Sequence, residues 1–168
     1  MTPPIEAPLP ATMSIESAIH WYEATPVGTF LRSADPLLME FAQLFHVFGL
    51  VVLFAAAILL SLRPFGIGLP GIALPRLLQT LKPFLLTGLV VTLASGVVMF
   101  GSVPGLYHIS PAFWPKIGIL AVAIAVQLAL LRGLAGNPSS VLVRGSAALS
   151  LLLWFGVGAF GRAIAYVS

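Results

Sequence analysis

The side chain best suited to chemistry is His46, which lies inside a long apolar segment. An ionisable side chain within a membrane-spanning helix is costly, and it usually marks a functional site. Gln43 precedes His46 by one helical turn and Gly49 follows it by one turn, so the three residues share one face. Two interpretations stay open. His46 is either a ligand for a bound group or a neutral imidazole that bonds to a neighbouring helix.

A second helical face, later in the chain, carries small and polar side chains at intervals of three or four residues. Such a row usually allows two helices to pack closely. The alternative is that small side chains leave room for a flat cofactor, with a methionine thioether as a soft ligand. The row consists of Gly88, Thr92, Ser95, Gly96 and Met99.

Lys116 and Arg162 are expected near the same membrane surface as His46. They either extend toward lipid phosphates or form a cationic pocket for haem propionates, a quinone headgroup or another anion. His108 is expected on that side too, as a solvated side chain or as a further metal ligand. Gly156, Gly158 and Gly161 reduce the side-chain bulk of the last segment, so we expect Trp154 and Arg162 to lie close to a neighbouring helix.

The elements that must position these side chains are four apolar segments, near 37–62, 79–102, 112–133 and 141–166. Each reaches the roughly 20 residues that cross a bilayer as a helix. Only 8% of the 168 residues are charged, against roughly 25% in soluble domains. Long continuous apolar runs exclude an outer-membrane barrel, whose strands alternate. We therefore predict an all-α integral membrane four-helix bundle over residues 35–168.

Two segments precede the bundle. Residues 1–12 are rich in proline and lack a basic residue, so we expect a retained, extended or disordered segment rather than a signal peptide. Residues 13–34 mix aromatic and charged side chains and are interrupted at Thr25-Pro26, which predicts an amphipathic interfacial helix. Helix caps are expected at Asp35, at Ser110 and within 137–140, while Pro83 either opens or kinks the second span.

The basic residues predict the orientation, because lysine and arginine in short loops stay cytoplasmic. The first and third loops contain Arg63, Arg76, Lys82, Arg132 and Arg144. Every acidic residue falls on the opposite side of the membrane. We therefore expect a protein of the bacterial inner membrane with both termini in the periplasm. The cations are scattered singly, which argues against a nucleic-acid partner.

Two absences narrow the chemistry. The chain has no cysteine, which excludes thiolate metal sites, iron–sulfur clusters and thiol catalysis. No acidic residue follows Glu40, which excludes a carboxylate pair or an acidic proton relay within the bundle. We assign no catalytic residue.

Five short motifs occur in a fixed order along the chain. They are Phe45-His46-Val47-Phe48-Gly49, Ser61-Leu62-Arg63-Pro64-Phe65-Gly66, Pro111-Ala112-Phe113-Trp114-Pro115-Lys116, Ser150-Leu151-Leu152-Leu153-Trp154 and Gly161-Arg162-Ala163-Ile164-Ala165-Tyr166. Together these motifs resemble a bacterial family of small four-helix inner-membrane proteins catalogued as a domain of unknown function. The resemblance covers most of residues 15–167 and implies fold and location without an established activity. Where the family leads us to expect an aspartate, this chain has Ser61. A looser similarity links it to small membrane b-type cytochromes and copper-handling proteins.

Two functions are in competition at this point. The first is a haem b electron-transfer subunit, with His46 as one axial ligand and Met99 or His108 as the other. The second is a non-catalytic membrane anchor or assembly subunit. Its partner is then a periplasmic protein, or the chain forms a homo-oligomer. Copper handling through Met39, His46, Met99 and His108 is a variant of the first function, although methionines at helical spacing more often serve packing. Transport has the least support, because the bundle lacks an internal acid and an evident inverted repeat.

Overall fold

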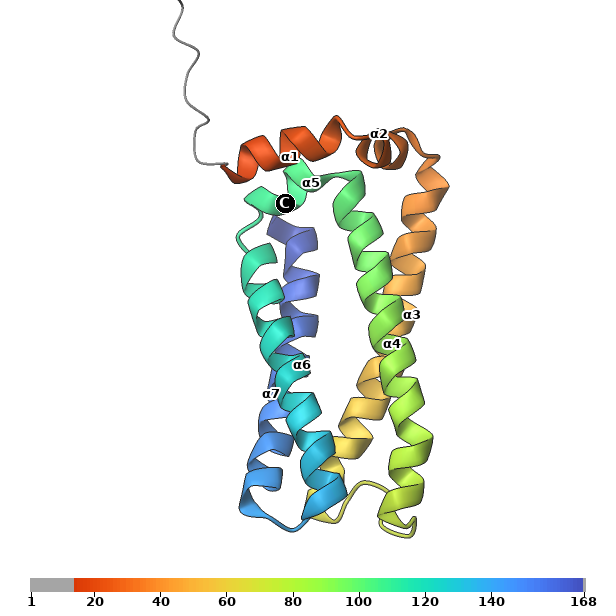
Figure 1. Ribbon diagram of the computed structural model, residues 1–168, viewed down its shortest axis with the longest axis vertical. Coiled ribbons are helices and arrows are strands. Elements are labelled where there is room, and N and C mark those ends of the chain that lie inside the picture. Colours follow the sequence, from red (N-terminus) through yellow and green to blue (C-terminus); the bar gives the residue numbers. More distant parts are fainter. Residues whose placement is uncertain (1–13, 168) are drawn as a thin grey trace, which may run out of the picture.

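The computed structural model describes the backbone of residues 14–167 and the side chains of residues 14–163. All the regular structure in this range is helical (Figure 1), which confirms the predicted all-α fold. The expected extended segment over residues 1–12 lies outside the described residues. The elements are α1 (Ile15–Glu23), α2 (Pro26–Ser33), α3 (Pro36–Leu62), η1 (Arg63–Phe65), α4 (Leu74–Ser102), α5 (Pro104–Ile109), α6 (Phe113–Gly136) and α7 (Val141–Val167).

Four helices, α3, α4, α6 and α7, are long and apolar enough to cross a membrane. Three of them begin within a residue or so of the predicted spans. The second begins earlier than expected, because α4 starts at Leu74 and continues through Pro83. Proline in a helix interior removes one backbone hydrogen bond. Leu77 and Leu85, on either side of Pro83, are both buried, and α4 is continuous across the proline.

The four long helices form two antiparallel pairs, α3 with α4 and α6 with α7 (Figure 1). The first pair is especially close. A Cβ atom added to Gly88 would lie 2.6 Å from the Leu53 backbone nitrogen, and one added to Gly49 would lie 2.9 Å from that of Thr92. Small residues are therefore required along this seam.

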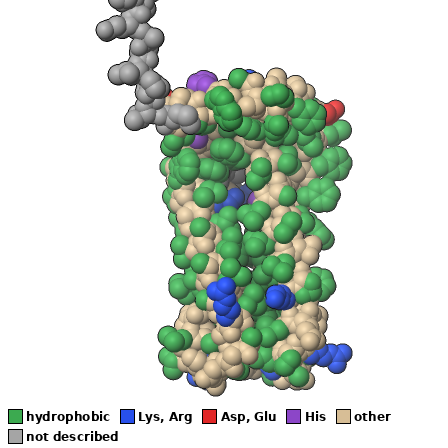
Figure 2. Space-filling view, in the orientation of Figure 1, with side chains coloured by type: hydrophobic (Ala, Val, Ile, Leu, Met, Phe, Trp, Pro, Cys, Tyr) green, Lys and Arg blue, Asp and Glu red, His purple; other side chains and the backbone are tan. Residues whose placement is uncertain are grey.

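The apolar core occupies the half of the bundle nearer the α3–α4 loop. It runs from Leu60 and Leu134 up to the level where Phe54 of α3 meets Trp154 of α7, with ring centroids 6.0 Å apart. On α3 the core cluster reaches only as far as Leu53, which lies two helical turns from His46 on the side of the α3–α4 loop. In the other half, Figure 2 shows the surface hollowed between the two helix pairs, with a basic side chain visible inside the hollow.

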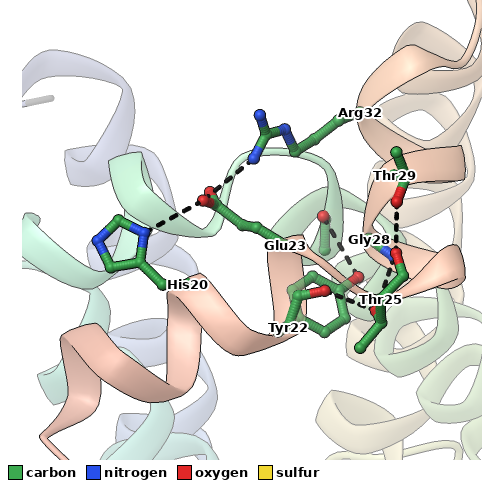
Figure 3. A network of polar contacts seen from close by, with 8 residues as sticks. His20, Tyr22, Glu23, Thr25, Gly28, Thr29 and Arg32 are labelled. Carbon is green, nitrogen blue, oxygen red and sulfur yellow. Dashed lines mark hydrogen bonds and ion pairs between the residues drawn. The ribbon is translucent and has the colours of Figure 1, made fainter.

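Helices α1, α2 and α5 lie across the end of the bundle nearer this hollow (Figure 1). The Tyr22 hydroxyl donates to the Gly101 carbonyl at 3.3 Å, which attaches α1 to the end of α4. Thr25 caps α2 by accepting from the Gly28 amide at 3.1 Å, and Glu23 pairs with Arg32 at 3.0 Å (Figure 3). The interruption at Thr25-Pro26 thus divides the amphipathic segment into two short helices.

The predicted helix caps meet different outcomes. The Asp35 carboxylate accepts from the Leu37 amide at 2.9 Å, and the Ser140 hydroxyl accepts from that of Leu142 at 3.2 Å, as expected. The predicted cap at Ser110 is wrong, because α6 begins two residues beyond the expected proline and its N-cap, Ala112, makes no side-chain bond. The Ser110 amide instead donates to the Tyr107 carbonyl, so Ser110 ends α5.

Candidate functional site

The predicted site residue His46 meets α4 through its imidazole ring. Its Nδ1 atom lies 3.1 Å from the Ser95 hydroxyl oxygen. Ser95 in turn approaches the Val91 carbonyl of the preceding turn at 2.6 Å. Ser95 is buried, and His46 is half-buried. The histidine is therefore held in one orientation by a neighbouring helix.

These distances assign the proton on the ring. The shortest contact of the Ser95 hydroxyl is with the Val91 carbonyl, which can only accept, so the hydroxyl proton goes there. The Ser95 oxygen can then accept from His46, which favours the tautomer that carries its proton on Nδ1. A neutral imidazole has one donor and one acceptor nitrogen, which leaves the lone pair of Nε2 available. A ligating histidine is commonly oriented by such a hydrogen bond from its other nitrogen.

The absence of a side chain at Gly96 makes room for the ring. A Cβ atom added there would lie 3.2 Å from His46 Cε1, which is closer than nearly all such contacts. Beside it, the Thr92 hydroxyl is buried and has no hydrogen-bond partner among the described residues. This part of the α4 row, Thr92 to Gly96, is thus the part that contacts His46.

Lys116 contributes a positive charge from the opposite helix pair. Its Nζ atom would lie 3.5 Å from a Cβ atom on Gly161 of α7, and its charge is close enough to act on the His46 ring. Lys116 is half-buried, and within the described residues no carboxylate pairs with it. Arg162, exposed on α7, follows Gly161 directly. Helices α3, α4 and α6 therefore contribute to the surroundings of His46, and α7 packs beside Lys116.

The remaining predicted site residues are distributed more widely. Gly49 and Gly88 lie in the α3–α4 seam, Gln43 is exposed on α3, and Met99 is half-buried one turn beyond Ser95. His108 lies in α5, where its Nδ1 is 3.0 Å from the Gly105 carbonyl. Among the described residues, there is no group of three histidine or acidic side chains arranged to hold a metal ion.

Trp154 belongs to a polar network in the core that the sequence analysis did not identify. Gln127 Oε1 accepts from the Ser150 hydroxyl at 2.7 Å and from the Trp154 indole at 3.1 Å. Gln127 is the single polar residue between Lys116 and Arg132. A lone amide in an apolar span is a signal for an interhelical hydrogen bond, and it could have been used.

Comparison with known proteins settles the relationship suggested by the motifs. A family model described as a family of unknown function, DUF6644, matches residues 18–167. The chain belongs to the DUF6644 family. No curated protein and no solved structure matches it. In this DUF6644 protein, the matched region includes His46, Ser95, Gly96 and Lys116, so the whole candidate site lies within the family domain.

Proposed function

We propose that this integral membrane protein binds haem b in the half of the bundle nearer α1 and α2, where His46 Nε2 would be a ligand of the iron. The observation that carries the proposal is the contact between His46 Nδ1 and the Ser95 hydroxyl, because it orients the ring and, with the proton on Nδ1, leaves the Nε2 lone pair as the one that can bind iron. A bound haem would supply one-electron transfer across or along the membrane.

Two further features of the bundle support this function. Lys116 provides a half-buried cation beside His46 without a carboxylate partner among the described residues, as a haem propionate requires. The apolar core ends two turns below His46, and the surface is hollowed between the helix pairs there (Figure 2). Met99 on α4 or His108 on α5 would supply a second ligand of the iron.

The test is an ultraviolet–visible spectrum of the full chain, expressed with ample haem and purified in mild detergent, before and after dithionite. We expect a Soret band with sharpened α and β bands on reduction, lost in His46→Ala. His20→Ala is the matched control, since His20 is exposed on α1, and it should retain the spectrum. A featureless spectrum of the wild-type protein would refute the haem proposal.

Ser95→Ala separates ligand orientation from ligation itself. Removing the hydroxyl leaves the His46 ligand but takes away the group that orients it, so haem should bind with a changed reduction potential and weaker retention. Potentiometric titration of the two proteins measures this change. Identical potentials and haem occupancy would show that Ser95 does not position a haem ligand.

A second candidate function is a membrane anchor for a periplasmic protein. It is favoured by the layer of α1 and α2, which exposes Trp21, Val27 and Phe30 at the end of the bundle. A partner that docks on this layer would stay bound after mild solubilisation and would dissociate from the variant Trp21→Ala/Phe30→Ala. Intact binding in that variant would count against this candidate.

For location, we propose a bacterial inner membrane, with the α1–α2 layer on the periplasmic side. The proposal follows from the basic loops that join α3 to α4 and α6 to α7, since such loops remain cytoplasmic.

A further inference from the structure

The end of the bundle away from α1 and α2 carries an excess of positive charge. The acidic residues within the described range, Glu16, Glu23, Asp35 and Glu40, all lie in or near α1, α2 and the first turns of α3. The opposite end has only basic side chains among its described charges: Arg63, Arg76, Lys82, Arg132 and Arg144. Figure 2 shows several of these basic side chains among apolar ones in the lower half of the molecule. Any neutralisation of this charge must come from outside the described chain.

Two of these arginines converge on a groove of about 620 Å³ between the two helix pairs. The groove lies where η1, at the end of α3, packs against α7. Its lining combines two arginines with apolar side chains, and includes Arg63, Phe65, Leu74, Pro138, Ser139 and Arg144.

Arg63 is held in place before any ligand binds. Its Nη1 donates to the Leu69 carbonyl at 3.0 Å and its Nη2 to the Ile72 carbonyl at 2.8 Å. Gly66 allows this arrangement, because its φ of +78° turns the chain back toward Arg63. A guanidinium has five N–H donors in a planar fork, so donors remain for a further acceptor.

Arg144 comes from the other helix pair, one turn into α7, and is exposed. A phosphate oxygen shared between the two guanidinium groups would make charge-assisted hydrogen bonds to both, which is the geometry that arginine favours for phosphate. Phe65, Leu74 and Pro138 in the same groove suit the glycerol and the first acyl carbons of a lipid. The groove lies at the end of apolar spans, where lipid headgroups are found.

We propose that this groove binds the phosphate of an anionic phospholipid, held between Arg63 and Arg144. A free phosphate ion offers the same chemistry, but it would make no contact with the apolar side chains of the groove. The site is separate from His46, and the proposal does not depend on haem binding.

The test is native mass spectrometry of the full chain in mild detergent, titrated with phosphatidylglycerol or phosphatidylcholine. We expect preferential retention of phosphatidylglycerol, weakened about tenfold in Arg144→Gln, which corresponds to one charge-assisted hydrogen bond. Arg144→Lys should lose less. Arg76→Gln is the matched control, since Arg76 is exposed at the same end but does not line the groove.

Three outcomes would overturn the proposal. One is equal retention of the two lipids by the wild-type protein. Another is an equal loss in Arg144→Gln and Arg76→Gln, which would mean that diffuse charge attracts the lipid. The last is displacement of the lipid by inorganic phosphate at comparable concentration, which would assign the groove to a free anion. Thermal melting of each variant confirms that it is folded. Arg63→Gln is less suitable, because it also removes the bonds that hold the loop at 69–72.

Discussion

At the scale of single residues, this bundle contains buried polar side chains that depend on one another. Ser95 orients His46, and Gln127 serves both Ser150 and Trp154. Some buried groups have no partner among the described residues, including the Ser61 hydroxyl and the Gln127 Nε2 atom. A buried donor without an acceptor lowers the stability of the folded protein. Substitutions that remove one member of a buried pair should therefore reduce the free energy of unfolding.

Gln127→Leu tests the network at the α6–α7 interface. The change keeps a similar volume but leaves the Ser150 and Trp154 donors without their acceptor, so the free energy of unfolding should fall by about 1–3 kcal/mol. Unfolding in detergent with added denaturant measures the change. Gln127→Leu/Ser150→Ala is the control and should recover part of the loss, because it removes one of the orphaned donors. A single variant more stable than the wild type would contradict the interpretation.

Tyr107 provides a pH-dependent test outside the membrane spans. Burial raises the pKa of the Tyr107 phenol above its usual value of 10.0. The folded state therefore favours the neutral phenol, and its contribution to stability is complete below the unfolded pKa and is lost as the pH rises through the folded pKa. We expect the wild-type protein to lose more stability than Tyr107→Phe as the pH rises through this alkaline range. Parallel melting curves of the two proteins at every pH would refute this role.

At the scale of helices, close contact within the α3–α4 pair depends on glycine. Gly88 faces backbone atoms of Leu53 and Gly49, and Gly49 faces the backbone and side chain of Thr92. A Cβ atom at either glycine would overlap these atoms. The α6–α7 pair is joined instead by apolar side chains and by the Gln127 network. The two pairs therefore tolerate different substitutions.

Gly88→Ala should disrupt the α3–α4 seam. Its Cβ would approach the Leu53 backbone to 2.6 Å, which backbone atoms cannot relieve by a rotamer change. We expect a loss of about 1–3 kcal/mol in unfolding free energy, as for other overpacked positions. Gly118→Ala on α6 is the matched control, because open space surrounds that position and alanine favours a helix by up to about 1 kcal/mol. Equal stabilities would show that the seam is looser than these distances indicate.

At the scale of the whole molecule, the two ends of the bundle differ in the elements that cover them and in their charge. One end is covered by α1, α2 and α5 and carries the described acidic residues, and the other has short loops and the groove between Arg63 and Arg144. Helix α3 begins on the covered side and helix α7 ends there (Figure 1). The candidate haem site and the candidate lipid site therefore belong to opposite membrane surfaces.

The proposed orientation can be tested by cysteine labelling, because the chain has no native cysteine. Ser33→Cys lies exposed in α2, and Gly136→Cys has open space at the end of α6. In intact spheroplasts, a membrane-impermeant maleimide should label Ser33→Cys and should label Gly136→Cys only after lysis. The reverse pattern would invert the proposed topology, and labelling of both before lysis would contradict a four-span arrangement.

Much of the architecture could be predicted from the sequence, because the properties concerned are local. A run of apolar residues of sufficient length is a transmembrane helix whatever surrounds it. The caps at Asp35 and Ser140 likewise involve only neighbours in the chain. For Pro83 the sequence left two alternatives open, and the structure decides between them, because α4 begins at Leu74 and continues through the proline. The prediction for Ser110 failed, because this residue ends α5 instead of capping α6.

For the candidate site, the sequence by itself determined that His46 lies inside a span, that Lys116 is near the same surface, and that no acidic residue follows Glu40 to neutralise it. Only the tertiary structure decided that Ser95 bonds His46 Nδ1, that Gln127 joins Ser150 and Trp154, and that Arg63 and Arg144 share a groove. The physical reason is that the partner of a side chain depends on how each helix is rotated and which helix lies beside it. Both are set by packing between segments far apart in the chain, which hydropathy and helical spacing do not encode.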